Sequence, residues 1–128
     1  MRAAGGGSIV NTASVAGLYA TPYVVAYGAS KHAVIGMTRT AAIEVAGDGI
    51  TVNAICPGPL ESRMMESIEA GVAPADPAGA RSRYMAAIPM GRYGSAEEIA
   101  EAAAWLLTAA PRYLTGQTLV VDGGLLAV

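Results

Sequence analysis

The sequence predicts an α/β protein built on a parallel sheet, and three observations carry this prediction. Short runs rich in β-branched residues cover residues 8–12, 50–56 and 117–121. Helical spacing of apolar residues fills two of the stretches between them, at about 27–46 and 95–110. Glycine or proline stands at most of the boundaries. Because strands that alternate with helices pair in parallel through crossovers, we expect about three parallel strands with crossover helices.

The first half of the chain is predicted to form a strand, a loop and a long helix. Residues 8–12 are apolar and β-branched, which is typical of a strand. Residues 13–23 contain serine, glycine and proline and are expected to form a loop. The helix that follows should end at Gly47, because glycine commonly stands just after a helix. Apolar residues recur on one face of this helix at spacings of three and four: Val34, Met37, Ala41 and Val45.

A second strand and a long irregular segment are predicted next. Residues 50–56 form the strand, and Pro57 breaks it. Prolines then punctuate residues 60–90, which are expected to be largely irregular, with short helices near 62–70 and 78–87. A segment of this length without a strand commonly serves as a lid or a binding loop. We therefore expect a substrate lid at about residues 60–90.

The last helix has a strong start signal. Ser95 and Glu98 have the spacing of a capping box, in which each side chain bonds the backbone N–H of the other residue. The helix continues through Trp105, which we expect in the core, and ends before Pro111. The third strand, residues 117–121, completes the predicted sheet.

Composition limits the classes of function. Of the 128 residues, 53% are hydrophobic and 14% are charged, which excludes a disordered chain and fits a single domain over residues 1–128. The net charge is −2 without a basic stripe, so neither nucleic acid nor a membrane is an expected partner. Apolar runs are shorter than the roughly 20 residues of a membrane span. The single cysteine, Cys56, cannot form an internal disulfide, which favours a reducing, cytoplasmic location.

Two polar side chains at the start of the long helix could move a proton. Tyr27 and Lys31 are four residues apart and therefore project from the same helix face. Lys31 is the only lysine, and its ammonium group would favour the phenolate form of Tyr27. Such a tyrosine can exchange a proton with an alcohol or carbonyl oxygen. The spacing alone also fits an ordinary surface pair.

Ser14 is a third candidate, because it follows the first strand at the sheet edge where parallel-sheet proteins bind ligands. Its hydroxyl could polarise a carbonyl oxygen that Tyr27 protonates, or it could bond its own backbone. No metal site is expected, since His32 has no second ligand at suitable spacing, and Cys56 is expected to be a buried thiol. Four arginines are expected to be solvated or, alternatively, to meet an acyl-phosphate partner: Arg63, Arg81, Arg83 and Arg92.

Together, Ser14, Tyr27 and Lys31, with Tyr27 thirteen positions after Ser14, resemble the active site of the short-chain dehydrogenase/reductase family. The resemblance covers nearly the whole chain, in the order and at the spacing of the family. It extends to the family's serine-bearing strand, YxxxK helix, PG turn, carboxyl-terminal helix and last strand. The stretches that carry it are Gly7–Ser14 (GSIVNTAS), Ala26–Lys31 (AYGASK), Val52–Gly58 (VNAICPG), Arg92–Ala100 (RYGSAEEIA) and Leu114–Gly124 (LTGQTLVVDGG).

This resemblance implies a Rossmann-type, NAD(P)-binding fold and an oxidoreductase that interconverts a secondary alcohol and a ketone. Tyr27 would be the acid/base, Ser14 would orient and polarise the substrate oxygen, and Lys31 would support Tyr27 and contact the nicotinamide ribose. The implied partners are a small-molecule alcohol or ketone, NAD or NADP, and further copies in a homodimer or homotetramer. The implied cofactor contacts are Tyr27, Lys31, Pro57, Gly58, Leu60 and Ser62, the last standing where the family usually has threonine.

The family pattern also exposes an absence. The Gly-rich turn that cradles the pyrophosphate, and the residue that selects NAD or NADP, have no match in this sequence. Residues 5–7 are a poor substitute, because they precede a strand whereas a phosphate loop follows one. We therefore expect the carboxyl-terminal half of the family's domain, whose first strand presents an open edge. The alternative to catalysis is a truncated, non-catalytic fragment with a role in assembly or none.

Overall fold

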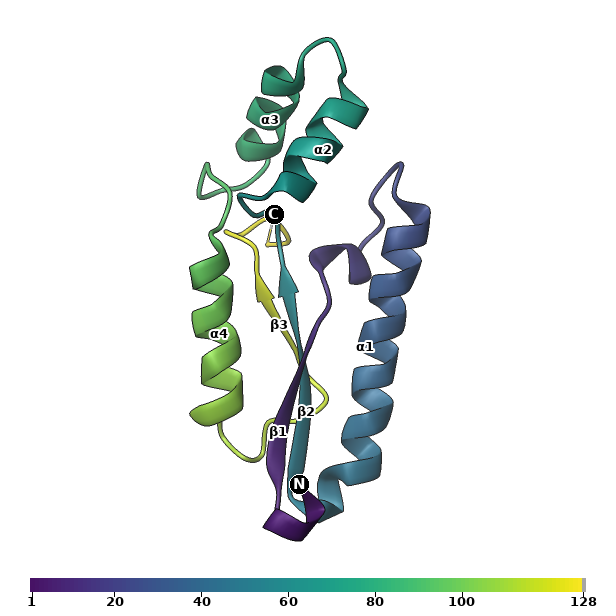
Figure 1. Cartoon of the computed structure of the whole chain (residues 1–128), viewed down its shortest axis with the longest axis vertical. Helices are drawn as coiled ribbons and strands as arrows, with labels where there is room; N and C mark the ends of the chain where they lie inside the picture. Colours follow the sequence, from purple (N-terminus) through teal and green to yellow (C-terminus); the bar gives the residue numbers. More distant parts are fainter. Residues whose placement is uncertain (128) are drawn as a thin grey trace.

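The computed structural model describes residues 1–127, and Val128, the last residue of the expected domain, lies outside the described part. Three parallel strands form one sheet in the order β1-β2-β3 (Figure 1). They are β1 (Gly7–Thr12), β2 (Ile50–Pro57) and β3 (Thr118–Val121). The expected small parallel sheet with crossover helices is confirmed.

Two long helices cover the sheet from opposite sides (Figure 1). α1 (Val25–Val45) connects β1 to β2, and α4 (Ala96–Thr108) precedes β3. Because side chains alternate along a strand, the central strand β2 offers one set to each helix, and it is buried over its whole length. None of the helices in residues 1–127 is long and apolar enough to cross a bilayer.

The buried face of α1 overlaps the apolar face read from the sequence. Three of the four predicted residues, Val34, Ala41 and Val45, are partly buried and pack against the core, whereas Met37 is 62% exposed. The fully buried residues are their neighbours Ile35, Thr38 and Ala42. Thr38 fits in the core because its hydroxyl accepts a hydrogen bond from Asn11 and donates to a backbone carbonyl one turn earlier. The spacing therefore identified the side of the helix that faces the core, but not the residues at the centre of that side.

The segment between β2 and α4 contains the two short helices expected from the sequence. Both short helices are present, as α2 (Arg63–Val72) and α3 (Pro77–Ala86), and they pack on each other beyond the carboxyl ends of the strands (Figure 1). Ser62 and Asp76 cap them by accepting hydrogen bonds from backbone N–H groups of the first turns. Each helix has ten residues, and its limits lie within two residues of the predicted ones.

α4 confirms one prediction and corrects another. Both hydrogen bonds of the capping box between Ser95 and Glu98 are present, so the helix begins where the sequence indicated. Trp105, however, is 42% exposed, and the adjacent Leu106 is the buried residue. The helix covers the sheet with a narrow face of small residues and Leu106, which leaves the indole at the surface.

Candidate active site

The candidate catalytic residues lie at the end of the sheet that is formed by the carboxyl ends of its strands. Ser14 lies two residues beyond the end of β1, and Tyr27 and Lys31 lie on the first two turns of α1. Pro57 ends β2 at the same edge. In open parallel sheets, ligands bind at the carboxyl ends of the strands, which is where these four residues stand.

Lys31 joins the helix to the strand. Its Nζ donates a hydrogen bond of 3.2 Å to the carbonyl of Thr12, the last residue of β1. The same Nζ lies 5.5 Å from the centroid of the Tyr27 ring. Tyr27 is 37% exposed, so its ring remains accessible from solvent. The structure thus places the Lys31 ammonium group beside the Tyr27 phenol ring at the carboxyl end of β1.

Ser14 is almost buried, with 8% of its surface exposed. Its Oγ accepts a hydrogen bond of 3.2 Å from the N–H of Ala16 and so caps the short 3-10 turn Val15–Gly17. This is the local backbone bond that the sequence left open as an alternative. A hydroxyl also has a donor hydrogen and a second lone pair, so Oγ can still donate to a substrate oxygen.

Gly17 sets the distance between α1 and the loop that follows β1 and carries Ser14, which we call the Ser14 loop. A Cβ at this position would lie 2.8 Å from the carbonyl carbon and oxygen of Lys31 and 2.9 Å from Cδ1 of Ile35. Glycine permits this close backbone approach, whereas a larger residue would push the loop away. Sequence reasoning treated Gly17 only as a loop residue. Its role depends on a helix that begins eight residues later.

Cys56 lies next to the backbone of Ser14. The thiol is fully buried, and this burial raises its pKa, against smaller lowering effects of the Ser14 backbone, Arg39 and Lys31. The thiol therefore stays protonated and packs as a small apolar side chain. The expectation of a buried thiol is confirmed.

The loop after β2 is held by backbone hydrogen bonds. Leu60 forms a parallel bridge with Gly94, in which the Glu61 N–H donates to the Gly94 carbonyl at 2.9 Å and the Gly94 N–H donates to the Pro59 carbonyl at 3.0 Å. Since the bridge uses the groups on either side of Leu60, the Leu60 N–H points away from Gly94. Ser62 donates to the Leu60 carbonyl at 3.2 Å and tightens the turn into α2.

The base of this loop is packed against the end of β3. The Gly58 N–H donates to the Val121 carbonyl at 2.9 Å, and a Cβ on Gly58 would lie 2.8 Å from Cα of Asp122. The loop therefore leaves the sheet beside β3. Within residues 1–127 no hydrogen bond joins it to Tyr27 or Lys31.

The remaining polar candidates have structural partners. His32 Nδ1 lies 2.9 Å from the Gly28 carbonyl, and the described residues contain no group of three potential metal ligands. Three of the four arginines that were expected to be solvated form ion pairs. Arg92 Nη2 lies 2.7 Å from Glu98, and Arg83 Nη1 lies 4.0 Å from Asp76, although both arginines remain more than half exposed. Arg81 contacts two glutamates, one in the loop after β2 and one on α2.

Known proteins are similar to this chain in sequence and in structure. Residues 1–126 match the family model described as enoyl-(acyl carrier protein) reductase. The chain is also 44% identical over 119 residues to the 3-oxoacyl-[acyl-carrier-protein] reductase FabG of Thermotoga maritima, covering 93% of this chain and 45% of that protein. The chain belongs to the short-chain dehydrogenase/reductase family.

Solved short-chain dehydrogenase/reductase structures agree with this assignment. Levodione reductase superposes with a TM-score of 0.94 and 38% identity, over 100% of this chain and 50% of that chain. A putative 2-deoxy-d-gluconate 3-dehydrogenase from Agrobacterium tumefaciens, solved with bound NADP, gives a TM-score of 0.87 and 41% identity over 99% and 50%. The fold is therefore Rossmann-type, and the chain spans about half the length of the relatives it matches.

Proposed function

We propose that this chain supplies the catalytic half of an NAD(P)-dependent oxidoreductase that interconverts a secondary alcohol and a ketone. The supporting observation is the convergence of Ser14, Tyr27 and Lys31: the Lys31 Nζ lies 5.5 Å from the Tyr27 ring, and the Ser14 loop docks on the turn that carries Lys31. The relatives favour the same reaction class, because one is named a 3-oxoacyl reductase and another holds NADP.

Tyr27 is the acid/base in this proposal. Its phenol gives a proton to the ketone oxygen in reduction and takes it back in alcohol oxidation. The Lys31 ammonium group lies beside the Tyr27 ring, and its hydrogen bond to the Thr12 carbonyl holds it there. Ser14 Oγ donates to the substrate oxygen and stabilises the charge that develops there. NAD(P), when bound, supplies or accepts the hydride.

The loop over residues 57–62 is proposed to hold the nicotinamide end of the cofactor. The Leu60 N–H points away from the Gly94 bridge and can therefore donate to a carboxamide oxygen. Pro57 and Gly58 direct the loop out of the sheet, and the Ser62 hydroxyl lies at its far end, at the start of α2. Lys31 and Tyr27 complete the proposed contacts at the ribose. Either NAD or NADP fits this proposal.

The proposed partners are a small-molecule alcohol or ketone and further copies of the chain, in a homodimer or homotetramer in the cytoplasm. The alternative proposal is a non-catalytic fragment that retains only a role in assembly. Two observations favour it over a self-sufficient enzyme: in the described part of the chain β1 pairs with β2 alone, and the chain spans about half the length of the relatives it matches.

Titration of the 128-residue chain with NADH and with NADPH, followed by nicotinamide fluorescence, tests the proposal. We expect saturable binding by the wild type, weaker binding by Lys31→Met, and wild-type binding by Arg39→Met. Arg39 is the matched control, because it is an exposed cation two turns further along α1. Absence of binding to either cofactor would contradict a cofactor site in the isolated chain and favour the assembly role.

A further inference from the structure

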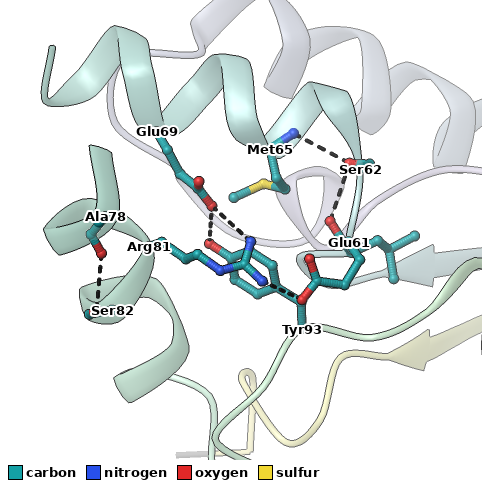
Figure 2. Close-up of polar contacts among 9 residues, drawn as sticks. Glu61, Ser62, Met65, Glu69, Ala78, Arg81, Ser82 and Tyr93 are labelled. Carbon is teal, nitrogen blue, oxygen red and sulfur yellow. Dashed lines mark hydrogen bonds and ion pairs between the residues drawn. The ribbon is translucent and has the colours of Figure 1, made fainter. Parts of the chain in front are cut away.

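Four polar side chains outside the candidate active site form one connected group between the lid helices and the rest of the fold (Figure 2). They come from the loop after β2, from α2, from α3 and from the stretch before α4. We name this group the lid cluster: Glu61, Glu69, Arg81 and Tyr93. Sequence reasoning missed it because its members are up to 32 positions apart and match no short motif.

The centre of the lid cluster is buried. Tyr93 is 2% exposed and Glu69 is 5% exposed, and the Tyr93 hydroxyl donates a hydrogen bond of 2.7 Å to Glu69 Oε1. Burial, together with the bond to Glu69, raises the pKa of Tyr93, so the hydroxyl keeps its proton and remains a donor. A carboxylate in such a place also needs a cation, since an unpaired buried charge is strongly unfavourable.

Arg81 supplies that cation. Its guanidinium lies 4.7 Å from the centroid of the Tyr93 ring, its Nη1 lies 3.8 Å from Glu69 Oε1, and its Nη2 donates a hydrogen bond to Glu61. Figure 2 shows the guanidinium between the two carboxylates and over the aromatic ring. One side chain of α3 therefore contacts α2, the stretch before α4 and the loop after β2.

The backbone bridge described above connects the lid cluster to the proposed nicotinamide loop. Glu61 stands between Leu60 and Ser62, and its N–H donates to the Gly94 carbonyl at 2.9 Å. Gly94 is in turn the neighbour of Tyr93. Arg81 thus holds both sides of the same bridge, through the Glu61 side chain on one side and the Tyr93 ring on the other.

We propose that Arg81 is a positioning residue that couples the lid helices α2 and α3 to the loop over residues 57–62. While its guanidinium binds both glutamates, the two helices and the loop move as one unit. The inference rests on the proposed function for the identity of the ligand, a nicotinamide cofactor, but the coupling itself does not. Arg81 acts through Glu61 and contacts no reacting atom.

Amide hydrogen exchange of the 128-residue chain, followed residue by residue by NMR, tests the coupling. In Arg81→Met the amides of Glu61 and Gly94 should exchange about fivefold faster than in the wild type, as expected for losing a partly exposed ion pair and a cation–π contact. Arg83→Met is the matched control, because Arg83 lies on the same helix, has a side chain that is 66% exposed and pairs with Asp76 instead. In Arg83→Met the amides of Glu61 and Gly94 should exchange as fast as in the wild type.

Amides of β2 report global stability in the same experiment. Faster exchange confined to Glu61 and Gly94 supports the coupling, whereas equal acceleration across β2, or unchanged rates at the two amides, overturns it. Glu61→Gln removes the charge at nearly constant size and should give the same local acceleration. Combining it with Arg81→Met should add little to the effect of Arg81→Met alone, because that change already removes the contact between Arg81 and Glu61; fully additive effects would overturn the proposal.

A cofactor titration separates this inference from the proposed function. Arg81→Met should weaken NADPH binding about fivefold, whereas Arg83→Met should leave it unchanged, because of the two arginines only Arg81 contacts Glu61 in the proposed nicotinamide loop. Equal effects in the two variants would overturn the coupling to the nicotinamide loop. If the wild-type chain does not bind NADPH, the proposed function fails for the isolated chain, and the exchange rates alone decide the coupling.

Discussion

Lys31 organises the candidate site as a single fixed cation. A lysine side chain carries about 2 kcal/mol of rotamer entropy, so it stays in one place only where a partner restrains it. The carbonyl of Thr12 provides this restraint at 3.2 Å, and it belongs to the end of a strand that the sheet holds rigidly. The charge beside Tyr27 is therefore set by the backbone of β1 as well as by the spacing along α1.

At this scale the decisive substitution is Tyr27→Phe. In an assembly that turns over substrate, it should lower kcat by about 10²–10⁴-fold, the usual contribution of general acid–base catalysis. The ring of Tyr27 is partly exposed, so loss of the hydroxyl should leave the fold unchanged by circular dichroism. Steady-state kinetics would compare it with Tyr113→Phe, a control at a fully exposed tyrosine. Undiminished kcat in Tyr27→Phe would refute the acid/base role.

At the scale of elements, the contact between the Ser14 loop and α1 depends on Gly17. We expect Gly17→Ala to lower the free energy of unfolding by about 1–3 kcal/mol, because its Cβ would overlap backbone atoms of Lys31. Gly36→Ala is the control, at a glycine of α1 itself where a Cβ would meet nothing within 4 Å. It should raise stability by about 1 kcal/mol through helix propensity. Urea unfolding measures both, and effects of equal sign would contradict the close approach.

The start of α4 contributes a pH-dependent term to stability. Arg92 and the backbone of Ser95 lower the pKa of Glu98 to about 2 from its ordinary 4.5. The pKa of Glu98 is lower in the folded chain than in the unfolded one. Ionised Glu98 therefore contributes fully to the stability of the fold at pH values above 4.5, and this contribution is lost as the pH falls toward 2. The stability difference between the wild type and Glu98→Gln, from urea unfolding at about pH 6 and about pH 3, should therefore shrink at the lower pH. A constant difference would count against this pairing.

At the scale of the whole molecule, residues 1–127 expose apolar surface on α1 and one edge of β1. Within these residues β1 pairs only with β2, and the exposed fractions of Val25 and Ile43 on α1 are more than four fifths. Exposed edges and apolar patches of this kind promote association. The proposed homodimer or homotetramer would bury the α1 surface.

Sedimentation velocity at several concentrations tests this assembly. The wild-type chain should self-associate, and Ile43→Glu should shift it toward the monomer, because a charge would then have to be desolvated in the contact. Ile43 is 82% exposed, so the substitution leaves the core untouched. Tyr113→Glu, at an exposed loop residue, should associate like the wild type. A wild-type monomer, or equal shifts in both variants, would rule out α1 as the contact.

Local signals account for the features that were predicted well. The capping box of Ser95 and Glu98 and the break at Pro57 act within a few residues, so helix and strand limits follow from neighbours in the sequence. The family resemblance rested on short motifs of the same kind. Met37 and Trp105 were placed less well, because their exposure depends on which element packs against each helix face.

By itself, the sequence determined the order of strands and helices, the candidate residues Ser14, Tyr27 and Lys31, and the family to which the chain belongs. Only the tertiary structure decided which residues of α1 are fully buried, how closely Gly17 approaches that helix, and that Arg81 joins α2, α3 and the loop after β2. The physical reason is the distance along the sequence over which each kind of interaction acts. Capping, turn chemistry and hydrophobic spacing act between near neighbours, whereas burial and ion pairing depend on residues that folding alone brings together.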